Sequence, residues 1–405
     1  MKKTNITYYC IAAIALLSCK GTIEKGNYPI IDIINCNETT PVTDIIDKDG
    51  IEFITSDSVI VIDMADDMNV NGFLFTNFFS TKMPPIFMSR DGSSVKTIGF
   101  VGRGPHEFAY PDMLSSCLNG DDEVIIVQRD KMLVDIFDID GTFKREIHLE
   151  DCGIGSNWWN YEAIALDGYC YLFSLYSNPS ALKWPSPIWC CFDLKNGKLV
   201  NQEKAKQKQE DNSTTNTGFI MLVDKYMNCR FVCVSPYKDH LIYRETSNDT
   251  IYSIDKNGKK PLYVFNTGHS NDPNYSKESI WENVLGVPSA IIETKEWILV
   301  YGKKNYCYNK KSGKLTEMAF QDPGLEFLAS FYPNPNSPGA ICHFLNYFYD
   351  KKTDSEYLYL DVRYRDKMLE ACKKSSIESL VKSAADIESR YDDISGMVVT
   401  IRLKK

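Results

Sequence analysis

The sequence predicts an all-β fold: a six-bladed β-propeller with five clear repeats, one more blade closed by both termini, and a short C-terminal helical insertion. Three observations predict it. A strand that ends in a glycine-containing turn recurs along the chain, another apolar strand precedes each copy, and apolar strands stand at both ends. Four-stranded sheets repeated around an axis bury both faces of every blade, so this pattern favours a propeller.

Five glycines mark the repeat, and each ends a turn between two strands. They are spaced 49, 56, 61 and 55 residues apart: Gly92, Gly141, Gly197, Gly258 and Gly313. Asp-Gly and Asn-Gly turns between alternating strands indicate hairpins, because glycine takes a positive φ without steric cost. An upstream strand such as 123–127 or 297–301, and one more strand between periods, give four strands per blade.

The two ends of the chain are expected to close the ring. A sixth repeat at 347–350 and 357–361 is weaker, and apolar strands at 51–54 and 397–403 can share its blade, which removes free sheet edges. Between them, residues 365–391 carry apolar side chains at helical spacing. We expect one or two helices there that pack against the propeller, with a partner-binding helix as the alternative.

The N-terminus resembles a bacterial lipoprotein signal. Two lysines precede an apolar run over 6–17, which ends in Leu16-Leu17-Ser18-Cys19. We expect residues 1–18 to be removed, Cys19 to carry the lipid, residues 19–45 to form a tether, and residues 46–405 to form the propeller. A simple secretory signal or a buried N-terminal helix is the alternative. The expected location is the cell envelope at the outer membrane, with the periplasmic or surface face left open.

Charge and composition exclude several partners and sites. Loss of residues 1–18 leaves 387 residues and changes the formal net charge from −9 to −11, because Lys2 and Lys3 are lost. An acidic surface repels nucleic acid, and no later segment has the apolar length of a membrane span. The N-terminal lipid is therefore the expected membrane attachment. The eleven remaining cysteines lack C-x-x-C spacing, so we expect buried free thiols.

The familiar catalytic motifs are incomplete in this sequence. His106-Glu107 begins like a zinc-protease helix, but Tyr110 stands where the second histidine belongs. Neither a G-x-S-x-G elbow nor a Walker loop occurs. Residues 67–72 have the spacing of half a calcium loop, but Phe78 replaces its glutamate, so we expect an ordinary hairpin turn. No catalytic residue, metal or cofactor is predicted.

One binding candidate is the glycine-flanked loop 153–162, which contains Trp158, Trp159 and Tyr161. Aromatic rings beside amides are suited to stacking on a sugar or a peptide. The alternative is that these rings pack between blades. Because loops on a rigid scaffold carry function, we expect the loop at one end of the central channel.

The second candidate is the glycine- and proline-containing loop with Arg103, His106 and Glu107. Charged side chains of this kind are costly to bury without a partner. We expect them on the same end of the channel as the aromatic loop, where they would bind ligand. The alternative is that Arg103 and Glu107 pair across the turn.

Residues 98–111, with the strands at 122–127 and 134–141 that follow, resemble one NHL-type propeller repeat. Nearly the whole mature chain resembles the six-bladed TolB-like/NHL-like β-propeller lipoprotein family of diderm bacteria. In that family a G-x-G-P-x-E-F segment joins blades, as 102–108 does here, and the closing strand ends before Leu-Lys, as 398–404 does. The match departs at His106, where the family often has glycine, and in the sixth repeat. The resemblance implies a binding or scaffold role.

Together these features predict a non-enzymatic cell-envelope lipoprotein that binds a ligand or protein partner through loops at one end of the propeller. A glycan, a peptide or an envelope protein is the expected partner. The alternative is a propeller hydrolase or lyase that acts on a glycan or peptide, because such an enzyme can assemble its site from single residues on several blades without a linear motif.

Overall fold

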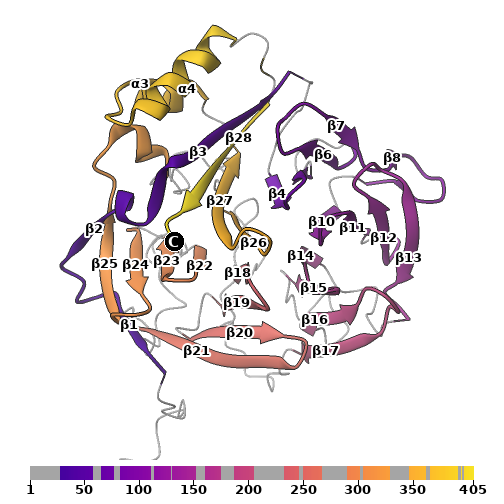
Figure 1. Cartoon of the computed structure of the whole chain (residues 1–405). Coiled ribbons are helices and arrows are strands. Elements are labelled where there is room, and N and C mark those ends of the chain that lie inside the picture. Colours follow the sequence, from indigo (N-terminus) through magenta and orange to yellow (C-terminus); the bar gives the residue numbers. More distant parts are fainter. Residues whose placement is uncertain are drawn as a thin grey trace, which may run out of the picture.

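Six blades surround a central axis in the computed structural model of the protein (Figure 1). The structure describes residues 28–57, 65–76, 83–110, 114–128, 130–151, 160–174, 187–204, 232–245, 250–266, 290–301, 304–328, 346–361, 365–390, 394 and 396–405. The predicted six-bladed β-propeller is confirmed.

Each of the first three blades contains four antiparallel strands, here ordered from the axis outwards. The first blade is β4 (Ala65–Met68), β5 (Gly72–Phe75), β6 (Ile86–Ser89) and β7 (Val95–Thr97). The second is β10 (Leu114–Asn119), β11 (Glu123–Gln128), β12 (Leu133–Asp138) and β13 (Phe143–His148). The third is β14 (Asn160–Leu166), β15 (Tyr169–Ser174), β16 (Pro187–Asp193) and β17 (Leu199–Lys204).

The fourth and fifth blades gain an outer strand from the N-terminal segment. The fourth is β18 (Val232–Tyr237), β19 (His240–Glu245), β20 (Thr250–Asp255) and β21 (Gly258–Asn266), with β1 (Ile30–Asp32) parallel to β21. The fifth is β22 (Ala290–Glu293), β23 (Trp297–Tyr301), β24 (Tyr306–Asn309) and β25 (Lys314–Ala319), with β2 (Thr39–Pro41) parallel to β25. Residues 30–41, expected in the tether, therefore belong to the propeller, because they cover edges that would otherwise be open. The short 3-10 helix η1 (Val42–Asp44) follows β2.

The sixth blade joins the two ends of the chain, as expected. It contains β26 (Asn346–Asp350), β27 (Ser355–Asp361), β28 (Gly396–Leu403) and β3 (Ile46–Ser56). β28 and β3 are antiparallel, with Val399 opposite Phe53. The outermost strand of the last blade is thus supplied by the N-terminal part of the chain, which closes the ring.

The repeat glycines lie at equivalent turns between the third and fourth strands of their blades, with Gly258 being the first residue of β21 itself. All five have a positive φ, between 68° and 129°. The turn at Gly92 also approaches the neighbouring blade so closely that an added Cβ would lie 2.1 Å from the Thr55 carbonyl oxygen. The sequence period therefore reports one structural position, repeated blade by blade.

Two helices, α3 (Arg365–Lys373) and α4 (Glu378–Ser389), separate β27 from β28. Their apolar side chains, including Leu369, Leu380 and Ile387, are buried against β3 and the 3-10 helix η3 (Pro323–Leu328). The packing interpretation of this insertion is correct. No helix within the described residues has the length and apolar character needed to span a bilayer.

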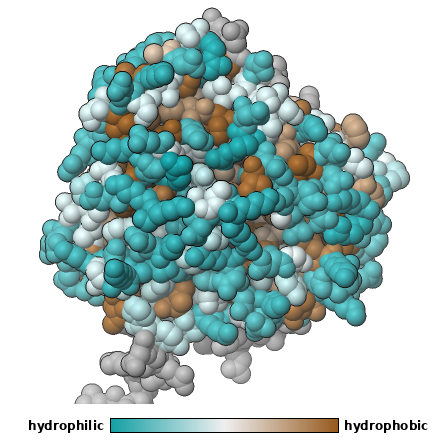
Figure 2. All heavy atoms as spheres, viewed as in Figure 1, coloured by the Kyte–Doolittle hydropathy of each residue, from teal (hydrophilic) through white to brown (hydrophobic). Residues whose placement is uncertain are grey.

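The face seen in Figure 2 is mostly hydrophilic, with apolar residues scattered over it. Apolar side chains fill the spaces between neighbouring blades instead; Leu74 of the first blade and Ile126 of the second, for example, share one buried cluster. Seven cysteines have described side chains and form no disulfide with one another, and only Cys36 among them is not fully buried.

Candidate functional site

The loop that joins the first and second blades is held in shape by Glu107. Two short parallel strands, β8 (Phe100–Val101) and β9 (Glu107–Phe108), frame it. The Glu107 carboxylate accepts a hydrogen bond of 2.6 Å from the Gly104 amide, and an added Cβ on Gly102 would lie 2.1 Å from the same carboxylate. The glycines of the motif leave room for this carboxylate, so Glu107 serves mainly to fold the loop.

Arg103 does not form the ion pair with Glu107 across the turn. Arg103 is exposed, and no ion pair joins the two side chains within the described part of the chain. The loop is fastened instead by Lys131, whose Nζ donates to the Glu107 carbonyl oxygen at 2.5 Å. Phe108, fully buried between the blades, anchors its other end.

His106 is turned towards the second blade. Its φ of 57° lies in the left-handed region that favours glycine, and its ring stacks on Phe143 with centroids 3.5 Å apart. Its Nδ1 lies 3.6 Å from Asp135 Oδ1 and 3.6 Å from Glu146 Oε2. These two carboxylates are opposite each other on β12 and β13.

The position of His106 differs from the expected one at the end of the channel. β12 and β13 are the two outer strands of their blade, and Figure 1 shows β8 at the outside of the ring beside them. The connection runs from the outermost strand of the first blade to the innermost strand of the second blade. His106 contacts the outer strands of the second blade. The charged loop therefore lies at the rim.

The other predicted residues cannot be placed in the same way. Cys19, Trp158 and Trp159 lie outside the described residues, and of Tyr161 only the backbone, within β14, is described. The binding role proposed for these aromatic residues stays a prediction.

Asp135 is the most constrained member of the group around His106. It is fully buried, and its Oδ2 accepts a hydrogen bond of 2.5 Å from Gln128 Nε2. Its Oδ1 has no hydrogen-bond partner among the described residues. Burial raises the pKa of Asp135 above its ordinary value, although the Gln128 hydrogen bond and the nearby His106 oppose this shift.

His106, Asp135 and Glu146 are also the one group of described residues arranged so that it could hold a metal ion, since one ligand atom of each lies within 4.8 Å of the others. Sequence reasoning identified His106 but not its partners. The available signal was Asp135 itself, a carboxylate in the middle of the apolar strand Leu133–Asp138.

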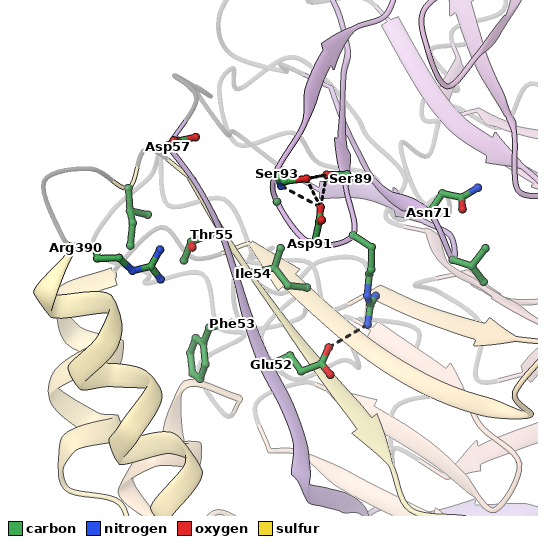
Figure 3. Close-up of a pocket in the computed structure, with 14 residues that line it drawn as sticks. Glu52, Phe53, Ile54, Thr55, Asp57, Asn71, Ser89, Asp91, Ser93 and Arg390 are labelled. Carbon is green, nitrogen blue, oxygen red and sulfur yellow. Dashed lines mark hydrogen bonds and ion pairs between the residues drawn. The ribbon is translucent and has the colours of Figure 1, made fainter.

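A second site lies at the seam where the first and sixth blades meet. The seam cleft has a volume of about 1400 Å³ and lies between β3, the β6–β7 turn and the end of α4 (Figure 3). Its lining combines charged, hydroxyl, amide and apolar side chains: Glu52, Phe53, Ile54, Thr55, Asp57, Val70, Asn71, Ser89, Arg90, Asp91, Gly92, Ser93, Arg390 and Ile394.

Arg90 is the fixed cation of the seam cleft. Its guanidinium lies 5.5 Å from the ring centre of Phe73 and 5.1 Å from that of Tyr357, and its Nη2 lies 3.6 Å from Glu52 Oε2. The aromatic rings hold the side chain by cation–π contacts. Glu52, with 60% of its side chain exposed, is free to exchange this contact for a ligand.

Asp91, next to Arg90 in the β6–β7 turn, is the fixed anion of the seam cleft. The hydroxyls of Ser89 and Ser93 donate to its Oδ1 at 2.6 and 2.7 Å, and Figure 3 shows the three residues together in the β6–β7 turn. These hydrogen bonds lower the pKa of Asp91 to about 2. A carboxylate of such low basicity accepts hydrogen bonds at neutral pH but is a poor general base.

Comparison with solved structures finds similar chains. A protein from Bacteroides fragilis that is described as exported has a solved structure with a TM-score of 0.54 and 15% identity, covering 93% of this chain and 100% of that chain. A member of the DUF4221 family from Bacteroides vulgatus has a TM-score of 0.37 and 10% identity, covering 78% of this chain and 84% of that chain.

No curated protein matches the sequence significantly. One family model matches residues 31–379, a segment that begins with β1 and extends into α4. The protein therefore belongs to the family described as a domain of unknown function, DUF4934.

Proposed function

We propose that this protein is a non-enzymatic binding protein of the cell envelope that holds a glycan segment in the seam cleft between its first and sixth blades. The observation that carries the proposal is the lining of this cleft, in which Glu52 and Asp91 lie on one side of β3 and Phe53 and Arg390 lie on the other. Ligand sites typically combine apolar surface with a few well-placed polar groups.

The chemistry of the lining favours a neutral, hydroxyl-rich ligand. Three carboxylates and two guanidiniums face the cleft, so its formal charge is about balanced, which favours neither a polyanion nor a polycation. Carboxylate, guanidinium and amide groups such as Glu52, Arg90 and Asn71 are planar and can bond two adjacent hydroxyls at once. On the other side of the outermost strand β3, the ring of Phe53 offers an apolar face for a sugar.

The same groups support binding rather than turnover. Ser89 and Ser93 lie beside Asp91, but Asp91 is too weak a base to activate a hydroxyl, and the lining contains neither histidine nor lysine. The hydrolase or lyase alternative would need a second group of raised pKa in the cleft.

The envelope location is part of the proposal and rests on the sequence Leu16–Cys19. The description of the similar Bacteroides fragilis protein as exported is consistent with it. We expect the lipid on Cys19 to be the membrane attachment, so the Cys19→Ala variant should leave the membrane fraction. A variant that stays membrane-bound and is processed normally would contradict this part.

A glycan array probed with the purified full chain in detergent tests the ligand. We expect Glu52→Ala and Phe53→Ala each to weaken binding roughly tenfold or more, since each removes a direct contact. Glu296→Ala, which alters an exposed carboxylate in the fifth blade, is the matched control and should bind normally. Binding to peptides alone, equal binding by all variants, or turnover of the ligand would each overturn the proposal.

A further inference from the structure

The junction between the first and second blades contains a buried carboxylate oxygen with no hydrogen bond. Asp135 is fully buried on β12, and its Oδ1 is unpartnered among the described residues. Burying an ionised carboxylate without full pairing is costly, so such an oxygen calls for a partner that the protein does not itself supply.

The atom nearest to this oxygen does not satisfy it. His106 Nδ1 lies 3.6 Å away, beyond the range of an N–H···O hydrogen bond, and has no hydrogen-bond partner among the described residues either. A protonated imidazole paired directly with a carboxylate would approach to about 2.8 Å. Two groups that face each other at 3.6 Å, both without a hydrogen bond, leave space for an atom between them.

Glu146 completes the arrangement from the neighbouring strand. Its Oε2 lies 3.6 Å from the same His106 Nδ1, and its side chain is 36% exposed. Two ligand atoms bound at 2.1 Å to a tetrahedral metal are separated by about 3.4 Å, which is close to both of these distances. The partly exposed glutamate opens the position to solvent, so water or a ligand could complete the coordination.

The surroundings hold the three side chains in place. Gln128, fully buried, donates to Asp135 Oδ2 and so directs Oδ1 towards His106. The ring of His106 stacks on Phe143, and its left-handed backbone conformation is one that few non-glycine residues adopt. Groups that orient metal ligands in this way are typical of metal sites.

We propose that His106, Asp135 and Glu146 bind a divalent transition-metal ion at the rim of the propeller. One imidazole and two carboxylates suit Zn²⁺ or Mn²⁺, whereas Ca²⁺ and Mg²⁺ prefer sites built from oxygen alone. His106 would bind through Nδ1 and carry its proton on Nε2. The site is separate from the seam cleft, on the other side of the first blade.

Metal titration of the purified full chain, after treatment with a chelator, tests the site. Zn²⁺ and Mn²⁺ are titrated in parallel by calorimetry, because Mn²⁺ has little affinity for thiolates elsewhere in the chain. We expect one ion bound per chain at this site. His106→Ala should lower its affinity roughly a hundredfold. His240→Ala, which removes a histidine of the fourth blade that pairs with Asp239 and Glu293, should leave binding within about threefold.

Asp135→Asn separates a metal site from a plain ion pair. We expect this variant to lose metal binding but to melt no lower than the wild type in the presence of chelator, since it removes a buried charge. If His106 and Asp135 only form an ion pair, Asp135→Asn should instead lower the melting temperature and the wild type should bind neither ion. That result, or unchanged binding by His106→Ala, would overturn the proposal.

Discussion

The two junctions that flank the first blade differ in how their polar groups are paired. At the seam with the sixth blade, Arg90 lies near Glu52, and Asp91 accepts hydrogen bonds from two serine hydroxyls. At the junction with the second blade, a loop fills the space, and Asp135 retains a buried oxygen that lacks a hydrogen bond among the described residues. Polar groups that already have partners around an open cleft are suited to reversible binding. A buried carboxylate oxygen without a hydrogen bond instead indicates that a bound ion satisfies it.

Deleting Met397–Lys405 should have the largest effect, because it removes nearly all of β28 from the seam. β28 lies between β27 and β3, so its loss leaves β3 without its partner strand and exposes the edge of β27 that does not pair with β26. We expect aggregation or failure to fold in size-exclusion chromatography and circular dichroism. Removal of Lys405 alone, which is exposed at the end of the chain, should be tolerated. A monomeric truncated protein with an unchanged melting temperature would contradict closure by the two termini.

Phe108→Ala should destabilise the protein much more than Phe53→Ala. Phe108 is fully buried between the first and second blades, and loss of such a ring costs about 3–5 kcal/mol. Phe53 is partly exposed at the seam cleft, so its loss should cost about 1 kcal/mol. Urea denaturation of both variants measures the difference. Equal losses would mean that the two junctions are packed alike.

Gly92→Ala tests how closely the β6–β7 turn packs against β3 in the wall of the seam cleft. Gly92 has a φ of 73°, and an added Cβ would meet the Thr55 carbonyl oxygen, whereas Gly120 has a φ of 65° with open space around it. Gly120→Ala should cost about 1 kcal/mol for the backbone conformation alone, and Gly92→Ala more than that. The difference in unfolding free energy isolates the contact between the turn and β3. No difference would show that the turn can move away freely.

The pH dependence of stability should show the effect of Asp67, a partly buried carboxylate between the inner strands of the first and second blades. Its oxygens accept hydrogen bonds from the Met68 and Leu118 amides, yet burial raises its pKa to about 6. Because the folded state then holds the proton more tightly than the unfolded state, stability should fall as the pH rises from about 4 to about 6, by at most about 1.4 kcal/mol per pH unit. Asp67→Asn should flatten this slope relative to the wild type. Identical slopes would contradict the shift.

The architecture could be predicted from the sequence because every blade of a propeller repeats the same arrangement of strands and turns. Gly141 and Gly313 are 172 residues apart, but they occupy equivalent turns in two blades, and both have a positive φ. A periodic pattern in the sequence was therefore enough to find the blades. The added strands β1 and β2 were missed because three residues such as Ile30–Asp32 carry no strand pattern of their own. β1 and β2 are extended because they pair with β21 and β25, which are distant in the sequence.

The candidate sites could be predicted only in part, for a related reason. His106 was singled out from its loop, but its partners follow on β12 and β13, and only the strand register brings Asp135 opposite Glu146. The seam cleft was not foreseen because Glu52 and Arg90 approach each other only after the ring has closed. Local sequence patterns indicate strands and turns. Sites between blades depend on contacts between residues that are distant in the sequence, which such patterns do not show.

Anomalous diffraction from crystals of the full chain grown with Zn²⁺, recorded above and below the zinc absorption edge, tests the central claim most directly. We predict a zinc peak about 2.1 Å from His106 Nδ1, Asp135 Oδ1 and Glu146 Oε2. If there is no peak between these atoms and His106 has instead closed to about 2.8 Å from Asp135, the buried oxygen is satisfied by an ion pair, and the claim is wrong.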